Sequence, residues 1–122
     1  MGNSEQKISI QSDYVLVERP KDYEVVFSEQ PTKLMEILTF CKDSGCRKVL
    51  IVGPRTKVSL SALVIYELGE DIAKSGLQIA MVESHDAPTD DEQFLESVTT
   101  NRGGSIQFFN NENEAKDWLR SQ

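Results

Sequence analysis

Two continuously apolar runs that alternate with helix-length segments constrain the fold of this chain more than any other feature. The runs are RKVLIVG (47–53) and LQIAMVE (77–83), and a third strand-like run, SIQFF (105–109), follows them. Continuous apolar runs are typical of strands buried on both faces of a parallel sheet. Strands that alternate with helices require right-handed crossovers and a mostly parallel sheet with helices packed on it. The alternation therefore predicts an α/β fold.

The N-terminal part supplies a hairpin and a first helix. The segment KISIQSDYVLVE (7–18) holds two short alternating apolar runs and predicts a β-hairpin with Ser12-Asp13 at its turn. Residues 21–44 carry a helical face, which Pro31 interrupts. Either this helix is kinked at Pro31, or it starts there and EVVF (24–27) forms a short strand.

Three further helices are expected between and after the apolar strands. One runs over 61–75 and ends at Gly76, one begins at Asp90, and the last is capped by Asn111. The expected inward positions of the first and the last of these are Ala62, Ile65, Tyr66, Gly69, Ile72 and Ala73, and Ala115, Trp118 and Leu119. The sequence thus predicts one domain over 1–122. It should hold a mixed, mostly parallel sheet of four to five strands, about four helices and a flexible tail at 1–6.

Charge and hydropathy exclude several function classes. The 122 residues include 13 Lys and Arg against 20 Asp and Glu, a net charge of −7. A field of this sign repels phosphate, so we expect no nucleic-acid partner. No run is apolar enough for a signal peptide or a membrane span, which favours a cytoplasmic protein.

The two cysteines, Cys41 and Cys46, indicate neither a disulfide scaffold nor a zinc site. Cys41 falls on the apolar stripe of the first helix, which favours a core residue. A redox pair with Cys46 is the alternative.

The residue types that carry catalysis do not form a coherent set. His85 is the only histidine, and its neighbours Ser84 and Asp86 share its loop, so the three cannot form a relay in which the histidine bridges the other two. The acidic clusters at 90–92 and 112–114 fall in first helical turns, where they stabilise the helix dipole. We therefore expect a protein that is not an enzyme, with no catalytic residue, no metal and no cofactor.

The segment GPRTKVSLS (53–61) leads from a strand into a helix, which is where α/β proteins commonly hold phosphates and substrates. A P-loop needs Gly before its Lys and Ser or Thr after it. Lys57 stands instead between Thr56 and Val58. The segment is therefore not a nucleotide loop.

The same segment carries the candidate regulatory residues. Ser59 or Ser61 either caps the helix or accepts a phosphate, and Arg55 and Lys57 are near enough in sequence to pair with that phosphate. Arg55, Thr56 and Lys57 form the candidate partner-contact loop.

The second half of the chain resembles a known family. The runs GCRKVLIV, YELGEDIAKSGLQIAMVE and FLESVTTNRGGSIQFFNNENEAKDWL are similar to the SpoIIAA-like group of the STAS superfamily. This superfamily covers anti-sigma factor antagonists and the cytoplasmic domains of sulphate transporters. The resemblance covers residues 45–119, and the first 44 residues only in element order. Its most specific pieces are Tyr66-Glu67-Leu68-Gly69, Asn101-Arg102-Gly103, Glu114-Ala115 and Trp118-Leu119.

The resemblance implies a non-enzymatic regulatory module that contacts another protein. The sequence leaves the oligomeric state open between a monomer and a homodimer. In the phosphorylated antagonists a partner kinase modifies a serine at the start of the second helix, which corresponds to Ser61 or its neighbour. Those antagonists also carry acidic residues where this chain has Val52 and Leu60. We therefore expect Ser59 or Ser61 to cap the helix, and partner binding to work by surface contact rather than by phosphate.

The resemblance also leaves an apolar ligand, a lipid or a membrane surface as the alternative partner, since some members of the group resemble lipid-carrier domains. Val25, Val26 and Phe27 are contiguous, and three adjacent apolar residues are more than one helical stripe can bury. One alternative is that one of them covers a pocket between the first helix and the sheet, or contacts a membrane. The other is that EVVF packs as a strand or a turn.

Overall fold

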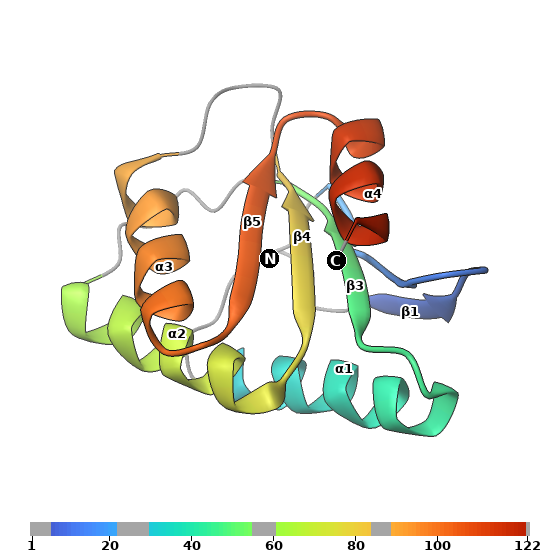
Figure 1. The fold of residues 1–122 in the computed structure, drawn as a ribbon, viewed down its shortest axis with the longest axis horizontal. Helices are drawn as coiled ribbons and strands as arrows, with labels where there is room; N and C mark the ends of the chain where they lie inside the picture. Colours follow the sequence, from blue (N-terminus) through green and yellow to red (C-terminus); the bar gives the residue numbers. More distant parts are fainter. Residues whose placement is uncertain (1–5, 22–29, 55–60, 84–88, 122) are drawn as a thin grey trace.

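A five-stranded mixed sheet forms the centre of the structure, a computed structural model that describes residues 6–21, 30–54, 61–83 and 89–121 (Figure 1). The strands are β1 (Lys7–Ile10), β2 (Val15–Glu18), β3 (Lys48–Val52), β4 (Gln78–Val82) and β5 (Ser105–Phe109). The helices are α1 (Gln30–Ser44), α2 (Ala62–Ser75), α3 (Asp90–Asn101) and α4 (Glu112–Arg120). The strands lie in the order β1-β2-β3-β4-β5; β1 is antiparallel to β2 and the other pairs are parallel. The predicted α/β fold is confirmed.

The predicted hairpin is present at the N-terminal edge of the sheet. Ile10 pairs with Val15, and the backbone N–H of Gln11 donates to the carbonyl oxygen of Tyr14 at 2.8 Å. Ser12 and Asp13 therefore lie at the turn, as the sequence predicts. Of the predicted tail, only Gln6 is among the described residues. Its amide donates to the backbone oxygen of Lys33 on α1 at 3.3 Å.

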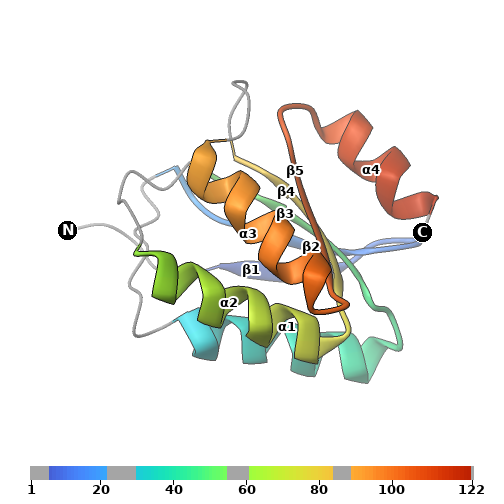
Figure 2. The ribbon, with the colours of Figure 1, turned by 60° about the vertical axis from the view of Figure 1, so that its left-hand side comes forward.

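Helices cover both faces of the sheet (Figure 2). α1, α2 and α3 lie on one face, and α4 lies alone on the other in the described part of the chain. Two hydrophobic clusters result, one on each face. The larger includes Val15, Val17, Val49, Ile51, Ile79, Met81, Ile106 and Phe108 from the strands. The smaller consists of Tyr14, Leu50, Ala80, Ala115 and Leu119. Successive residues of β3 and β4 enter opposite clusters, which explains why both runs are continuously apolar.

The described part of α1 runs from Gln30, so Pro31 lies at its N-terminal end. Proline is tolerated in the first turn of a helix, where its missing N–H breaks no intrahelical bond. The residues before Gln30 lie outside the described ranges, so both the kink and the helix start at Pro31 stay predictions. Residues 24–27 lie outside the described residues, and the short strand expected there stays a prediction.

Part of the predicted inward stripe of α2 is wrong. Ile65, Gly69 and Ile72 are buried as expected, whereas Ala62 is exposed and Tyr66 is 39 % exposed. The Tyr66 ring lies at the border of the helix, where the guanidinium of Arg102 stacks 4.4 Å from its centroid. A tyrosine ring can cover apolar surface and still keep a polar side toward water, so helical spacing alone did not place it.

Gly69 allows α2 and α3 to approach closely. A Cβ at this position would lie 2.8 Å from Cγ1 of Val98 and 3.1 Å from Oγ1 of Thr99. Gly104, between α3 and β5, likewise allows a close approach to α2, because a Cβ at this position would lie 2.7 Å from Cα of Ala73. Two of the sequence pieces that carry the family resemblance lie at this contact. The piece Tyr66–Gly69 supplies Gly69, and the piece Asn101–Gly103 supplies Arg102, which stacks on Tyr66 beside the contact.

We expect the substitution Gly69→Ala to lower the free energy of unfolding by about 1–3 kcal/mol, since Val98 would have to shift. Urea unfolding followed by circular dichroism measures the change. Ala is favoured over Gly in a helix interior by about 1 kcal/mol. A free energy of unfolding that rises in the variant would therefore contradict the close contact. Glu67→Ala, at an exposed position of the same helix, is the matched control.

Candidate functional site

The carboxyl ends of the parallel strands form one edge of the sheet, and the segments that follow them carry the candidate residues. Glu18, Val52, Val82 and Phe109 lie side by side in register along this edge. Ligands and partners of α/β proteins are commonly met at such an edge. Residues 55–60 follow β3 and residues 84–88 follow β4, and both segments lie outside the described residues. The roles expected of Arg55, Thr56, Lys57 and Ser59 therefore stay predictions. His85 and Asp86, of which we expect no catalytic role, lie in the second of these segments.

Ser61 is the N-cap residue of α2. Its backbone is extended, with φ −70° and ψ 153°, and its Oγ accepts a hydrogen bond from the backbone N–H of Val64 at 3.2 Å. This bond satisfies one of the N–H groups that the first turn of a helix leaves without an intrahelical partner. Ser61 thus has the capping role that we expected of Ser59 or Ser61.

Val52 occupies the place where the phosphorylated antagonists are expected to carry an acidic residue. It ends β3, and its half-buried side chain packs against the smaller hydrophobic cluster under α4. A carboxylate here would be drawn into apolar surroundings, which disfavour the charged form. Leu60, the second such position, lies outside the described residues.

Two large apolar side chains are exposed on α2 directly after the cap. Leu63 is 66 % exposed, and Tyr66, three positions later on the same side of the helix, is 39 % exposed. We call Leu63 and Tyr66 the α2 surface. Sequence reasoning missed it, because Tyr66 was placed in the core. Phe94, on the neighbouring helix α3, is 41 % exposed.

The α2 surface is bordered by acidic side chains of the same helix. Glu67 and Asp71 are exposed, and Glu70 is half-buried. Glu70 forms an ion pair with Lys74, with 3.3 Å between Oε1 and Nζ. The exposed side of α2 thus combines an apolar start with carboxylates in the following turns.

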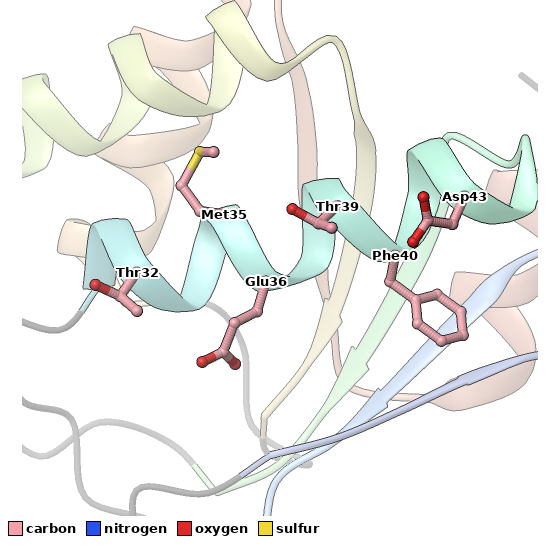
Figure 3. Close-up of a pocket in the computed structure, with 6 residues that line it drawn as sticks. All are labelled: Thr32, Met35, Glu36, Thr39, Phe40 and Asp43. Atoms are coloured by element: carbon pink, nitrogen blue, oxygen red, sulfur yellow. The ribbon is translucent and has the colours of Figure 1, made fainter.

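A shallow groove of about 440 Å³ lies along the outward side of α1 (Figure 3). Its lining residues are Thr32, Met35, Glu36, Thr39, Phe40 and Asp43. They all come from one helix, and Met35 and Phe40 point to opposite sides of it. On the inward side of α1, Ile37 and Cys41 are buried in the larger cluster. The groove therefore differs in position from the pocket expected between the first helix and the sheet. Val25, Val26 and Phe27 lie outside the described residues, so the apolar-ligand alternative stays a prediction.

A second groove, of about 710 Å³, lies at the opposite, amino end of the sheet. The hairpin turn, the end of α1 and the start of β3 line it, with Asp13, Cys46, Arg47 and Lys48 among the lining residues. Close to it, Nε of Arg120 lies 2.8 Å from Oδ2 of Asp13, and this hydrogen bond lowers the pKa of Asp13. The ion pair ties the end of α4 to the hairpin turn.

Glu96 has a structural partner rather than a catalytic one. Its Oε2 accepts the backbone N–H of Phe108 on the edge strand β5 at 3.0 Å. Burial raises the pKa of Glu96, and the hydrogen bond from Phe108 partly offsets this effect. In the described ranges no three His, Cys, Asp or Glu side chains come together in a way that could hold a metal ion. None of the described helices is both long and apolar enough to cross a membrane.

Comparisons with known proteins support the fold and do not identify a function. No family model matches the chain, and no curated protein matches it. A solved structure that is similar is the NMR structure of the protein TM1081, with a TM-score of 0.55 and 20 % sequence identity. The match covers 94 % of this chain and 88 % of that chain. At this identity the likeness shows a common fold alone.

We expect Ser61→Ala to lower the free energy of unfolding by about 1 kcal/mol, because the N–H of Val64 loses its acceptor. Ser61→Asp should stay close to the wild type, since Asp is an equally good N-cap residue. Chemical denaturation of the three proteins measures both effects. Equal losses in the two variants would contradict the capping role.

The Asp13–Arg120 pair should make stability depend on pH in the acid range. The pKa of Asp13 is lower in the folded than in the unfolded chain. The pair therefore stabilises the folded state at a pH above the ordinary pKa of 3.8, and this stabilisation is lost as the pH falls through the lowered pKa. The unfolding midpoint of Asp13→Asn should therefore lie below that of the wild type near neutral pH and converge with it in strong acid. Added salt should shrink the difference, because both side chains are exposed to solvent. A difference that grows toward low pH would contradict this account.

Proposed function

We propose that this protein is a non-catalytic protein-interaction module of the STAS type, which contacts another protein through the α2 surface. The observation that carries the proposal is the exposure of Leu63, 66 %, two positions after the cap at Ser61. A single exposed leucine is common on a protein surface. Here Tyr66 adds a second large side chain on the same side of the helix, next to the segment that the resemblance implicates in regulation.

The energetics of the α2 surface favour a protein partner with an apolar centre. Fully burying a leucine is worth about 1.5–3 kcal/mol relative to leaving it in water. Interfaces generally place aromatic and apolar side chains at the centre and polar groups at the rim. Leu63 and Tyr66 match the centre, and Glu67 and Asp71 match the rim. The complementary partner therefore carries basic side chains around its own apolar contact.

Contact rather than phosphate is the proposed mode of recognition. The Oγ of Ser61 already accepts the N–H of Val64, and Val52 is an apolar residue that packs under α4. Both observations fit a domain that presents a fixed surface. A cytoplasmic location and a monomeric or homodimeric state are parts of the same proposal.

Substitution of Leu63 tests the proposal. Leu63→Asp should weaken binding of a physiological partner at least tenfold, about 1.4 kcal/mol, because it puts a charge at the centre of the contact. The measurement is quantitative mass spectrometry of proteins that co-purify with the tagged chain from its own cell, followed by titration calorimetry with the partner. Met35→Asp is the matched control, since Met35 is a 55 % exposed apolar residue on a different helix.

Two outcomes would contradict the proposal. One is a Leu63→Asp protein that keeps every partner while the Met35→Asp protein loses them, which would move the interface to α1. The other is a Ser61 that is stoichiometrically phosphorylated in the cell and binds its partner only in one phosphorylation state. Circular dichroism of both variants confirms that they remain folded.

A further inference from the structure

The two cysteines lie on either side of the turn that ends α1. Cys41, in the last turns of the helix, is 3 % exposed and belongs to the larger hydrophobic cluster. Cys46 follows the turn, is half-buried, and lines the groove at the amino end of the sheet. Both are free thiols in this structure. Solvent therefore reaches Cys46 through the groove, whereas Cys41 lies inside the protein.

The backbone brings these two residues to adjacent places. Gly45 takes the left-handed conformation, with φ 73°, and the N–H of Cys46 donates to the carbonyl oxygen of Cys41 at 3.1 Å. This bond is the hydrogen bond of a Schellman motif, which links the second residue after the helix end to the helix residue five positions before it. Side chains at these two positions commonly contact each other. Cys46 also packs against the hydrophobic cluster that contains Cys41.

The two thiols differ in chemical character. Burial raises the pKa of Cys41 to about 11, and the proximity of Cys46 contributes to the rise. At neutral pH Cys41 is therefore a protonated thiol, and because it is buried a peroxide in solution does not reach it. Cys46 has access to reagents through the groove that it lines. An accessible thiol beside a buried one is the arrangement of an attacking cysteine and its resolving partner.

We propose that Cys41 and Cys46 form a reversible intramolecular disulfide, in which Cys46 reacts first with a hydroperoxide and Cys41 resolves the product. In the first step the sulfur of Cys46 attacks the terminal oxygen of the hydroperoxide. The O–O bond breaks, the alcohol or water leaves with the thiol proton, and Cys46 becomes a sulfenic acid. In the second step the sulfur of Cys41 attacks the sulfur of Cys46. The S–O bond breaks and the oxygen leaves as water with the proton of Cys41. Two thiols are oxidised and one peroxide is reduced.

The disulfide would fix the junction between α1 and β3. A disulfide needs Cα atoms roughly 4.4–6.8 Å apart. The hydrogen bond from the N–H of Cys46 to the carbonyl oxygen of Cys41, at 3.1 Å, holds the two backbones next to each other. The bond would close only the short loop from Cys41 to Cys46, so it should constrain the unfolded chain little. Its main effect is therefore to lock the turn and to remove a thiol from the groove.

Treatment of the full-length protein with stoichiometric hydrogen peroxide tests the proposal. We expect both free thiols to disappear together, the intact mass to fall by two hydrogens, and a peptide that links Cys41 to Cys46 to appear in the digest. Dithiothreitol should restore both thiols. A wild-type protein that accumulates sulfinic acid on Cys46, or that forms disulfide-linked dimers, would overturn the proposal.

Two single variants separate the roles of the thiols. With Cys41→Ala, peroxide should stop at a sulfenic acid on Cys46, which dimedone traps as a stable adduct. With Cys46→Ser, Cys41 should keep its free thiol under the same treatment. Rapid oxidation of Cys41 in the absence of Cys46 would contradict the assigned order. If the buried substitution prevents folding, the linked peptide of the wild-type protein still decides whether the disulfide forms.

Discussion

The burial of β3 and β4 on both faces is the constraint on which the rest of the structure depends. Val49, Leu50, Ile79 and Ala80 are all almost fully removed from water, although neighbours along each strand point to opposite sides. A sheet with two apolar faces needs a helical layer on each of them. α1, α2 and α3 supply one layer, and α4 supplies the other through Ala115 and Leu119. The short helix α4 is therefore a necessary part of the core.

Within the described ranges, several polar side chains at helix ends stabilise the fold. Thr89 and Glu92 cap α3 reciprocally, Asn111 caps α4, and Arg120 holds Asp13. Each of these polar groups satisfies a helix end or joins two elements. The described surface also carries exposed large apolar side chains, among them Leu63 and Tyr66 on α2. These two side chains are the reason that we propose recognition through α2.

The sequence predicts interactions between residues that are close along the chain better than interactions between residues that are far apart. The hairpin turn and the capping of α2 by Ser59 or Ser61 depend on residues a few positions apart, and both can be inferred from the sequence. The stacking of Arg102 on Tyr66 joins separate helices, and the Arg120–Asp13 pair joins residues 107 positions apart. Helical spacing identifies one apolar side of α2 but cannot tell which border residue a distant arginine covers. Tyr66 therefore lies at the exposed border of α2, whereas the spacing predicts it on the buried side.

The bond from Phe108 to Glu96 has a consequence for how copies of this protein meet. β5 is an edge strand of the sheet in the described part of the chain, and the backbone groups along its outer side are a template onto which a strand of another molecule can add. Glu96 occupies one of these donors with a carboxylate from α3 and places a negative charge beside it. An incoming strand would have to displace that side chain before it could pair. One glutamate on a neighbouring helix thus closes one pairing position along this edge of the sheet.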